Sequence, residues 1–507
     1  MLATICSFGI LGIEAYPVSV EVDLAPGVPS FQTVGLPDGA VRESRERVRA
    51  ALTNSGFALP LGRLTVNLAP ADVRKEGAAF DLPIAMGILA AAGTVAPERL
   101  EGVAMVGELG LDGGVRPVRG VLSMAVAAKA ARIHTLLVPA QNAPEAAVAR
   151  GPQVLVAPCL AQVAAWARGE GELPSPPAGS DSPPAPGSGP ELAEVRGQEH
   201  AKRALIVAAA GGHNMLMVGP PGSGKTMLAR RLPAILPPLT LDEALEVTRI
   251  ASVAGQLPPS QGLITARPFR SPHHTISDVG LVGGGSVPRP GEVSLAHHGV
   301  LFLDELAEFR KSVLEVLRQP LESGVVTITR AAATVQFPAR FMLVGAMNPC
   351  PCGYLGDRRR ACTCTPQQIR NYLGRISGPL LDRIDIQVEV PAVDYHDLAG
   401  APTGPTTAQA AELVQAARSR QLKRLGPHGL TCNAQMGSAL TRRYCTLPPE
   451  GQRLLAQACE RLGLSARAYT RILKIARTIA DLEGAEQIGL VHLSEAISYR
   501  SLERLMP

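Results

Sequence analysis

A glycine-rich stretch near the middle of the chain restricts the fold more than any other feature of the sequence. An apolar run, 214–218, precedes it, and a helical pattern follows from Met227. This strand–loop–helix context is the one that a phosphate-binding loop requires, with backbone N–H groups and a helix N-terminus facing the phosphates. The sequence therefore predicts an α/β core that binds a nucleoside triphosphate. The stretch reads G-x-x-x-x-G-K-[ST] and comprises Gly219, Pro220, Pro221, Gly222, Ser223, Gly224, Lys225 and Thr226.

A second segment, 300–305, places two acids directly after four apolar residues. The apolar run is typical of a central parallel strand that is covered on both faces, and open α/β sheets bind ligands at the carboxyl ends of their strands. We expect Lys225 to reach the β- and γ-phosphates, and Thr226 and Asp304 to complete the Mg²⁺ shell. Glu305 is expected to polarise the attacking water. ATP and Mg²⁺ are therefore the expected cofactors.

Composition sets broader limits. The chain has 507 residues, of which 46% are hydrophobic and 18% charged, which is enough for three domains with sizeable cores. Because the net charge is only +5, any argument for nucleic acid must come from local basic patches. No targeting signal and no unbroken membrane-spanning run is visible, so we expect a cytoplasmic protein without a membrane partner.

Composition also divides the chain. Residues 173–190 contain seven prolines without apolar periodicity, which predicts a linker. Residues 1–172 combine strand and helix patterns (strands at 18–22 and 64–68, helices at 39–55 and 82–92) and predict an α+β domain. The nucleotide motifs fall in 191–393. Helical spacing in 394–507 predicts a helical C-terminal domain with helices at 407–425, 448–463, 466–483 and 492–505.

Longer motifs make the chain similar to the ComM/YifB family of magnesium-chelatase-like AAA+ ATPases, over essentially its whole length. The resemblance implies an α/β AAA+ P-loop core with a parallel sheet and helices on both faces, an N-terminal Lon-protease-like (S5 domain 2-like) domain, a helical C-terminal lid and a homohexamer. The motifs are GLPDGAVRESRERVRAAL (35–52), LAPADVRKEGAAFDLPIAMGILAA (68–91), VRGQEHAKRAL (195–205), FRSPHHTISDVGLVGGG (269–285), NPCPCGYLGD (348–357) and RISGPLLDRIDI (375–386).

The same resemblance implies further catalytic residues. Asn348, after an expected strand at 342–346, looks like the sensor 1 amide that would hold the attacking water or the γ-phosphate. Arg383 looks like the arginine finger that acts on the nucleotide of the neighbouring subunit, with Arg375 as a weaker candidate, and Arg467 looks like sensor 2. A guanidinium suits these roles because it stabilises transition-state charge on phosphoryl oxygens. A surface or ion-pair role is the alternative for each arginine.

The resemblance also bears on proteolysis. It places Ala79 at the serine position and Leu122 near the lysine position of a Lon-like active site. Neither a hydroxyl nor an amine is available there, so we expect no peptidase activity. The domain is instead expected to bind DNA or to help form a ring.

Four of the nine cysteines, Cys350, Cys352, Cys362 and Cys364, form a C-x-C…C-x-C pattern within an insert at 350–364. Four thiolates this close in sequence can surround Zn²⁺ tetrahedrally, whereas cytosolic disulfides are uncommon. We predict a structural zinc that stiffens the chain after sensor 1; four reduced thiols without metal are the alternative. The histidine pairs at 273–274 and 297–298 are expected to have structural or polar network roles, because neighbours on a strand point to opposite faces.

Two inserts are candidates for DNA contact. The glycine-rich segment 283–291 carries Arg289, and a hairpin expected at 325–337 carries Arg330 near its tip. In related ring ATPases these two elements line the channel, where arginines follow a phosphate backbone without reading bases. A solvated arginine on a structural hairpin is the alternative.

The expected function is that of an ATP-dependent DNA translocase or helicase that promotes branch migration during homologous recombination and natural transformation. DNA, a recombinase and the competence machinery are its expected partners. One alternative is a motor subunit of a magnesium or cobalt chelatase, against which the Lon-like domain and the cysteine cluster argue. The other is a protein-remodelling ATPase, for which the missing nucleophile at Ala79 excludes only proteolysis in the same chain.

Overall fold

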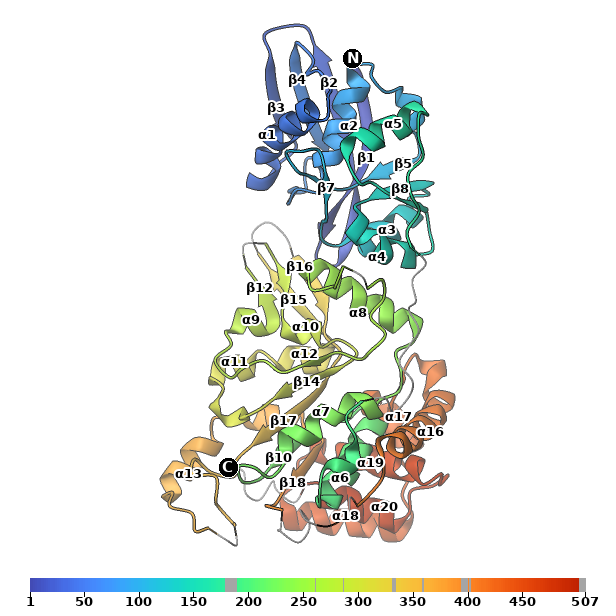
Figure 1. Ribbon diagram of the computed structural model, residues 1–507. Helices are drawn as coiled ribbons and strands as arrows, with labels where there is room; N and C mark the ends of the chain where they lie inside the picture. The colour runs from blue at the N-terminus through green and yellow to red at the C-terminus, as the bar shows by residue number, and fades with distance from the viewer. Residues whose placement is uncertain are drawn as a thin grey trace. The chain divides into compact units, whose positions relative to one another are not determined.

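The computed structural model describes residues 1–177, 189–259, 261–285, 287–330, 334–357, 360–393, 400 and 403–500. Most of the linker expected at 173–190 therefore lies outside the described residues. The chain forms two compact units (Figure 1). Each unit encloses a hydrophobic core of its own. The first comprises Met1–Ser182, Ala244–Ile264 and Ala331–Gln336, and the second comprises Pro183–Glu243, Thr265–Arg330 and Phe337–Pro507.

A seven-stranded sheet in the order β3-β4-β2-β1-β5-β8-β9 organises the first unit. Its strands are β1 (Leu2–Leu11), β2 (Glu14–Ala25), β3 (Ser30–Val34), β4 (Arg63–Ala69), β5 (Val103–Met105), β8 (Thr135–Val138) and β9 (Gln153–Val156). The strands β1, β5, β8 and β9 run parallel, whereas β2 is antiparallel to both β1 and β4. The unit also contains the short strands β6 (Glu108–Leu109) and β7 (Val115–Arg116) and the helices α1 (Gly39–Asn54), α2 (Asp81–Ala91), α3 (Val121–Ala130), α4 (Ala143–Val148) and α5 (Leu160–Arg168).

The strands and helices expected in 1–172 are confirmed, and α2 shows how closely they pack. Every residue of α2 is buried. A Cβ on Gly87 would lie 2.6 Å from Val22 Cγ2 of β2, so glycine lets this helix approach the sheet. Ala79 and Leu122 both belong to an apolar cluster with Phe8. Apolar core side chains thus occupy the two positions that the resemblance assigned to nucleophile and base.

Helix α8 (Leu241–Ala254) follows the P-loop helix in sequence, yet from Ala244 onward it belongs to the first unit. Arg249 donates to the Glu14 carboxylate at 2.7 Å and to the Ile13 carbonyl at 3.1 Å. Ser252 donates its hydroxyl hydrogen to the buried Glu145 carboxylate. These polar contacts fix α8 to strand and helix elements of the N-terminal region.

Five parallel strands in the order β11-β14-β17-β10-β18 form the sheet of the second unit. They are β10 (Met215–Val218), β11 (Phe269–Arg270), β14 (Val300–Leu303), β17 (Met342–Met347) and β18 (Ile386–Glu389). All residues of β10, β14 and β17 are buried, which confirms the predicted parallel α/β core. Around them lie α6 (Glu199–Gly211), α7 (Lys225–Ile235), α9 (Asp278–Val282), α10 (Glu292–Leu295), α11 (Lys311–Glu315), α12 (Arg318–Ser323), α13 (Pro366–Leu373) and α14 (Gly378–Leu381).

Two hairpins extend this core. The antiparallel strands β12 (Gly283–Gly284) and β13 (Arg289–Pro290) form the first, and β15 (Val325–Thr329) pairs with β16 (Thr334–Pro338) in the second. A Cβ on Gly291 would lie 2.3 Å from the Gly283 nitrogen, so only glycine fits at position 291, where the two strands of the first hairpin meet. The expected hairpin at 325–337 is confirmed, although its tip, 331–333, lies outside the described residues.

The C-terminal region is helical, as predicted. Its helices are α16 (Thr407–Leu425), α17 (Ser438–Tyr444), α18 (Pro449–Leu462), α19 (Ala466–Leu482) and α20 (Leu490–Ser498). The last helix starts two residues earlier than expected and ends at Ser498, and 501–507 lie outside the described residues. In the part of the chain that the structure describes, no helix combines the length and the hydropathy that crossing a bilayer needs.

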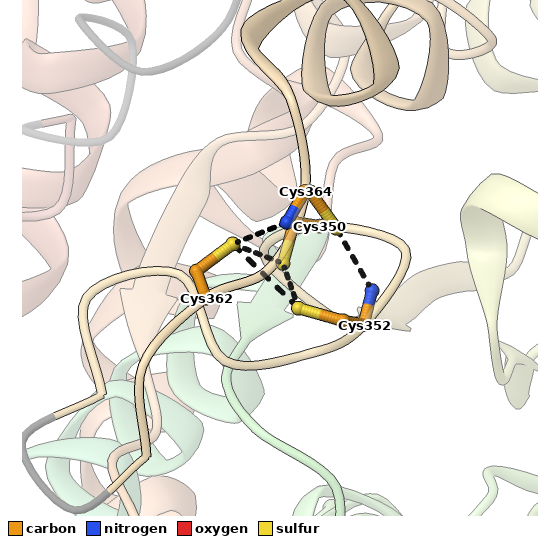
Figure 2. Close-up of side chains that lie close together, drawn as sticks. All are labelled: Cys350, Cys352, Cys362 and Cys364. Atoms are coloured by element: carbon orange, nitrogen blue, oxygen red, sulfur yellow. Dashed lines mark hydrogen bonds between the residues drawn. The ribbon is translucent and has the colours of Figure 1, made fainter.

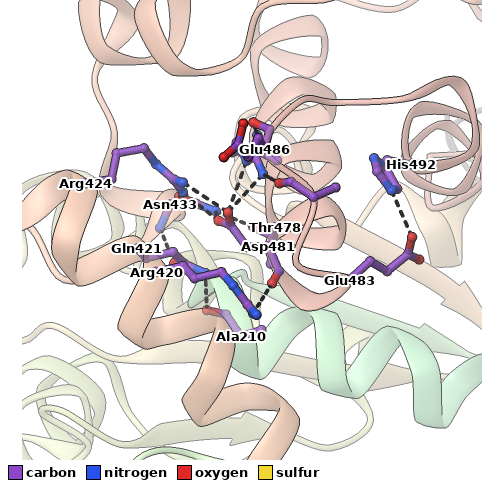
Figure 3. A network of polar contacts seen from close by, with 12 residues as sticks. Ala210, Arg420, Gln421, Arg424, Asn433, Thr478, Asp481, Glu483, Glu486 and His492 are labelled. Atoms are coloured by element: carbon purple, nitrogen blue, oxygen red, sulfur yellow. Dashed lines mark hydrogen bonds and ion pairs between the residues drawn. The ribbon is translucent and has the colours of Figure 1, made fainter.

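A buried carboxylate joins these helices (Figure 3). Asp481 of α19 is 1% exposed and accepts hydrogen bonds from Arg424 at 2.6 Å, Asn433 at 2.8 Å and Arg477 at 3.2 Å. Arg424 lies on α16, so the network ties together two helices that are distant in sequence. The carboxylate offsets the desolvation of both guanidinium groups.

We predict that Asp481→Ala destabilises the C-terminal helices by about 3–5 kcal/mol, because it leaves buried guanidinium groups without a counter-charge. Urea-induced unfolding followed by circular dichroism measures the effect. Glu460→Ala, which removes an exposed carboxylate from α18, is the control and leaves the midpoint unchanged. Equal midpoints for both variants would contradict the assignment of Asp481 as the organising group.

Candidate nucleotide-binding site

The P-loop joins β10 to α7 at the carboxyl edge of the parallel sheet. Gly222 and Gly224 have φ values of 74° and 91°, which favour glycine. A Cβ on Gly219 would lie 2.0 Å from the Val390 carbonyl oxygen, so the loop starts in a space that only glycine fits. Lys225 donates to the Gly219 and Pro220 carbonyls, both at 2.8 Å. Burial lowers the pKa of Lys225 to about 8, partly offset by Asp304.

The acidic end of β14 lies directly opposite this loop. Thr226 donates its hydroxyl hydrogen to Asp304 at 2.7 Å, and the Glu305 backbone N–H donates to the same carboxylate at 3.0 Å. Glu305 has a φ of 52°, a left-handed conformation that is uncommon outside glycine. A hydroxyl and a carboxylate are hard oxygen donors of the kind that Mg²⁺ binds. The two residues predicted to share the Mg²⁺ shell are thus adjacent.

Two further side chains, those of Asn348 and His274, lie at the same carboxyl edge of the sheet. Asn348, one residue beyond β17, brings its Oδ1 to 3.4 Å from Lys225 Nζ. His274 brings Nδ1 to 3.2 Å from the Glu305 carboxylate. The sequence indicated only that the histidine pairs serve in polar networks; the pairing of His274 with Glu305 was missed, because no spacing relates the two residues. His297 accepts a hydrogen bond from the Arg340 N–H at 2.9 Å.

The candidate arginine finger, Arg383, and the candidate sensor 2, Arg467, lie near the opposite, amino edge of the sheet. Arg383 precedes β18, and its carbonyl accepts from Asn214, the residue before β10, at 2.9 Å. Its side chain is buried and donates to the Pro379 carbonyl and to Glu322. Arg467 is 63% exposed, with Asp382 at 3.7 Å. The structure therefore brings neither arginine to the P-loop of its own chain.

Arg375, the weaker finger candidate, differs from Arg383 in its position. It donates to the Ala307 carbonyl at 2.9 Å and to Glu308 at 2.7 Å, within three residues of Glu305. Arg383, by contrast, lines a cavity of about 680 Å³ together with Glu322 and Arg330. The amino edge of the sheet thus carries an open space bordered by charged side chains.

The two arginines expected to meet DNA are both exposed and lie on neighbouring hairpins. Arg289 opens β13, and Arg330 follows β15 directly. A Cβ on Gly284 would lie 3.7 Å from the Arg330 guanidinium. The hairpins are therefore in contact at the point where their cations lie.

The four clustered cysteines converge after β17 (Figure 2). Cys350 Sγ lies 3.4 Å from Cys352 Sγ and 3.6 Å from Cys362 Sγ, while Cys364 Sγ accepts from the Cys352 N–H at 3.3 Å. All four ligand atoms lie within 4.8 Å of one another, and none is in a disulfide. The backbone N–H groups of Tyr354 and Thr363 lower the pKa of Cys352 to about 5, favouring a thiolate.

Comparisons with known proteins agree with this geometry. Family models described as magnesium chelatase subunit ChlI match residues 191–398 and 20–142, and its C-terminal model matches 404–500. The competence protein ComM of Haemophilus influenzae is 46% identical over all of this chain and 98% of its own length, and YifB of Escherichia coli is 44% identical over 98% and 96%. The magnesium-chelatase 38 kDa subunit of Rhodobacter capsulatus is 26% identical over 61% of this chain and 86% of its own. The chain therefore belongs to the magnesium-chelatase-like AAA+ ATPases that include ComM and YifB.

Proposed function

We propose that this protein is an ATP-driven DNA translocase that promotes branch migration in homologous recombination and natural transformation. The observation that carries the proposal is the joint arrangement of Lys225, Thr226, Asp304, Glu305 and Asn348 at one sheet edge, in a chain 46% identical to a competence protein. ATP is the substrate that would bind at this edge of the sheet. Mg²⁺, held by Thr226 and Asp304, would neutralise charge on the phosphates.

The residues of one chain supply half of the hydrolytic site. Lys225 exchanges its loop carbonyls for the β- and γ-phosphate oxygens, which are stronger acceptors because they are charged. Glu305 accepts the proton of the attacking water, and Asn348 orients that water or the γ-phosphate. His274 holds the Glu305 carboxylate on the side from which it acts.

A neighbouring chain supplies the other half. Arg383 lies at the amino edge of the sheet, separated from its own P-loop by the length of a four-residue strand, roughly 13 Å. Its guanidinium does not reach the γ-phosphate bound to its own chain, whereas a head-to-tail ring places one subunit's amino edge against the next subunit's P-loop. Arg467, close to Asp382, is the proposed sensor 2. In such a ring, the Arg383 guanidinium leaves Glu322 and binds the phosphate of the neighbouring subunit's nucleotide. The cavity beside Arg383 leaves room for the nucleotide to approach. We propose a homohexamer on this basis.

DNA engages the hairpins in this proposal. The exposed Arg289 and Arg330 lie on two contacting loops, and a ring multiplies this pair of cations around a central channel. Arginine side chains in such positions bind backbone phosphates and do not distinguish one base from another. This suits branch migration, which proceeds through any sequence. A recombinase and the competence machinery are the proposed partners, and the cytoplasm is the proposed location.

The other parts have supporting tasks. Residues 1–172 act as a non-proteolytic Lon-like domain that helps form the ring, 191–393 act as the AAA+ motor and 394–507 as its lid, with 173–190 as the linker. Cys350, Cys352, Cys362 and Cys364 hold a structural Zn²⁺ in the insert 350–364.

A motor role in a chelatase complex is the second candidate, favoured by the 26% identity to the Rhodobacter capsulatus subunit. Stimulation of ATP hydrolysis by forked DNA, and not by unfolded protein or a chelatase partner, separates the candidates.

We predict that Lys225→Ala weakens binding of a fluorescent ATP analogue roughly 10–100-fold and abolishes phosphate release, because hydrogen bonds to charged phosphate are lost. Arg230→Ala is the matched control, since it removes an exposed cation from the same helix and leaves both measurements unchanged. Normal turnover in the Lys225 variant would contradict the assignment of the P-loop.

We predict that Lys225→Ala and Arg383→Ala chains, each inactive alone, regain ATP hydrolysis when they are mixed. Random mixing pairs an intact P-loop with an intact arginine at about one interface in four. Phosphate release measures the recovery, and mixing Lys225→Ala chains with the double variant is the control that stays inactive. Full activity of the wild-type chain as a monomer would rule out the shared site.

We predict that Arg330→Ala weakens DNA binding at all sequences and reduces the slope of log affinity against log salt by about 0.9 for each subunit whose Arg330 contacts a phosphate. Fluorescence anisotropy with forked and single-stranded DNA at several salt concentrations measures both. Arg453→Ala, an exposed cation on α18, is the control and leaves the slope unchanged. Equal slopes for the two variants would remove Arg330 from the DNA interface.

A further inference from the structure

The cysteine cluster lies directly beside the nucleotide site, and its dimensions indicate a metal. A tetrahedral zinc with Zn–S distances of about 2.3 Å requires sulfur atoms about 3.8 Å apart, whereas a disulfide requires about 2.0 Å. The observed separations of 3.4 Å and 3.6 Å among Cys350, Cys352 and Cys362 fit the first and exclude the second. Four sulfur ligands select a soft or borderline ion such as Zn²⁺ and leave no open coordination position.

The first connection to the nucleotide site is covalent. Cys350 is fully buried and stands two residues after Asn348, whose Oδ1 lies 3.4 Å from Lys225 Nζ. A metal that fixes Cys350 therefore limits the positions that Asn348 can adopt. No other described segment links a cysteine so directly to a side chain at the phosphate end of the site.

The second connection is a packing contact. Gly353 follows Cys352 with a φ of 86°, and a Cβ at this position would lie 2.7 Å from Pro221 Cδ and 2.9 Å from Pro221 Cγ. The same Cβ would lie 3.8 Å from Asn348 Cγ. The backbone of the first C-x-C arm thus rests against the P-loop itself.

The third connection comes from the second C-x-C arm. Helix α13 begins two residues after Cys364, and it carries Tyr372, which is 5% exposed. The Tyr372 hydroxyl faces the backbone of Asn348, which lowers its pKa against the larger raising effect of burial. Asn348 is therefore flanked by two segments, one from each C-x-C arm, and Figure 2 shows the four cysteines of these arms converging.

We infer that Zn²⁺ bound by Cys350, Cys352, Cys362 and Cys364 forms a wall of the nucleotide site that positions Asn348 and Pro221 for binding of the triphosphate. The four cysteines position these groups and touch no substrate. The inference rests on the proposed function only for its ATP substrate, and nothing in it depends on DNA.

Metal analysis gives the first test. Elemental analysis of the purified full-length chain is expected to find one zinc per chain, and Co²⁺ substitution is expected to give the visible absorption of a tetrahedral thiolate site. Chelation of the zinc, or Cys362→Ser, is expected to weaken binding of a fluorescent ATP analogue about tenfold, as when one hydrogen bond to a charged phosphate is weakened. Added Zn²⁺ restores the affinity of the chelated protein. A chain without bound metal, or a chelated chain with unchanged affinity, overturns the inference.

A matched pair of glycines isolates the contact with the P-loop. Gly353 and Gly356 lie in the same loop with φ values of 86° and 80°, but a Cβ on Gly356 meets nothing within 4 Å. Both alanine variants carry the same backbone strain and all four cysteines. Gly353→Ala is expected to retain zinc while its nucleotide affinity falls several-fold more than that of Gly356→Ala. Equal affinities for the two variants overturn the inference.

The outcomes also separate this inference from the proposed function. Wild-type protein that binds zinc and nucleotide as described, yet hydrolyses ATP without any response to DNA, refutes DNA translocation and leaves the zinc-positioned wall in place. Wild-type protein that migrates branches while its affinity for nucleotide is independent of zinc refutes the wall and leaves translocation in place.

Discussion

Parallel pairing of β10, β14 and β17 is the constraint on which the nucleotide site depends. Because the three strands run in the same direction, the chain segments that follow them leave the sheet at one edge. The P-loop, the acidic pair after β14 and Asn348 after β17 are therefore neighbours, although up to 129 residues separate them along the chain. The hydrogen bond from Thr226 to Asp304 is the direct product of that alignment.

The same directionality explains why Arg383 lies away from the P-loop of its own chain. Residues that precede the strands leave the sheet at the amino edge, and Arg383 and Asn214 meet there. If Arg383 acts on phosphate as proposed, it acts from this edge on a second copy of the chain. The proposed function then couples nucleotide hydrolysis to ring assembly through a geometric property of a parallel sheet.

A buried carboxylate and a partly buried cysteine cluster hold two of the parts that surround this sheet. Asp481 fixes the C-terminal helices through two guanidinium groups (Figure 3). The four cysteines gather the chain after β17 (Figure 2), where Gly353 packs against Pro221 of the P-loop. The Asp481 carboxylate has few alternatives, because an unpaired charge is costly in the interior. In the proposed mechanism, the cysteine cluster keeps one wall of the nucleotide site in place while Lys225 exchanges its hydrogen-bond partners for phosphate.

The P-loop, the acidic strand end, the parallel core and the clustering of the cysteines could be predicted from the sequence alone, because each depends on short spacings or on burial patterns that local residues record. Only the tertiary structure showed that His274 meets Glu305, that α8 joins the first unit through Arg249, and that Gly353 packs on Pro221. These contacts join segments whose separation in sequence carries no periodic signal. Side-chain packing between distant elements decides them, and that packing exists only after the sheet has formed.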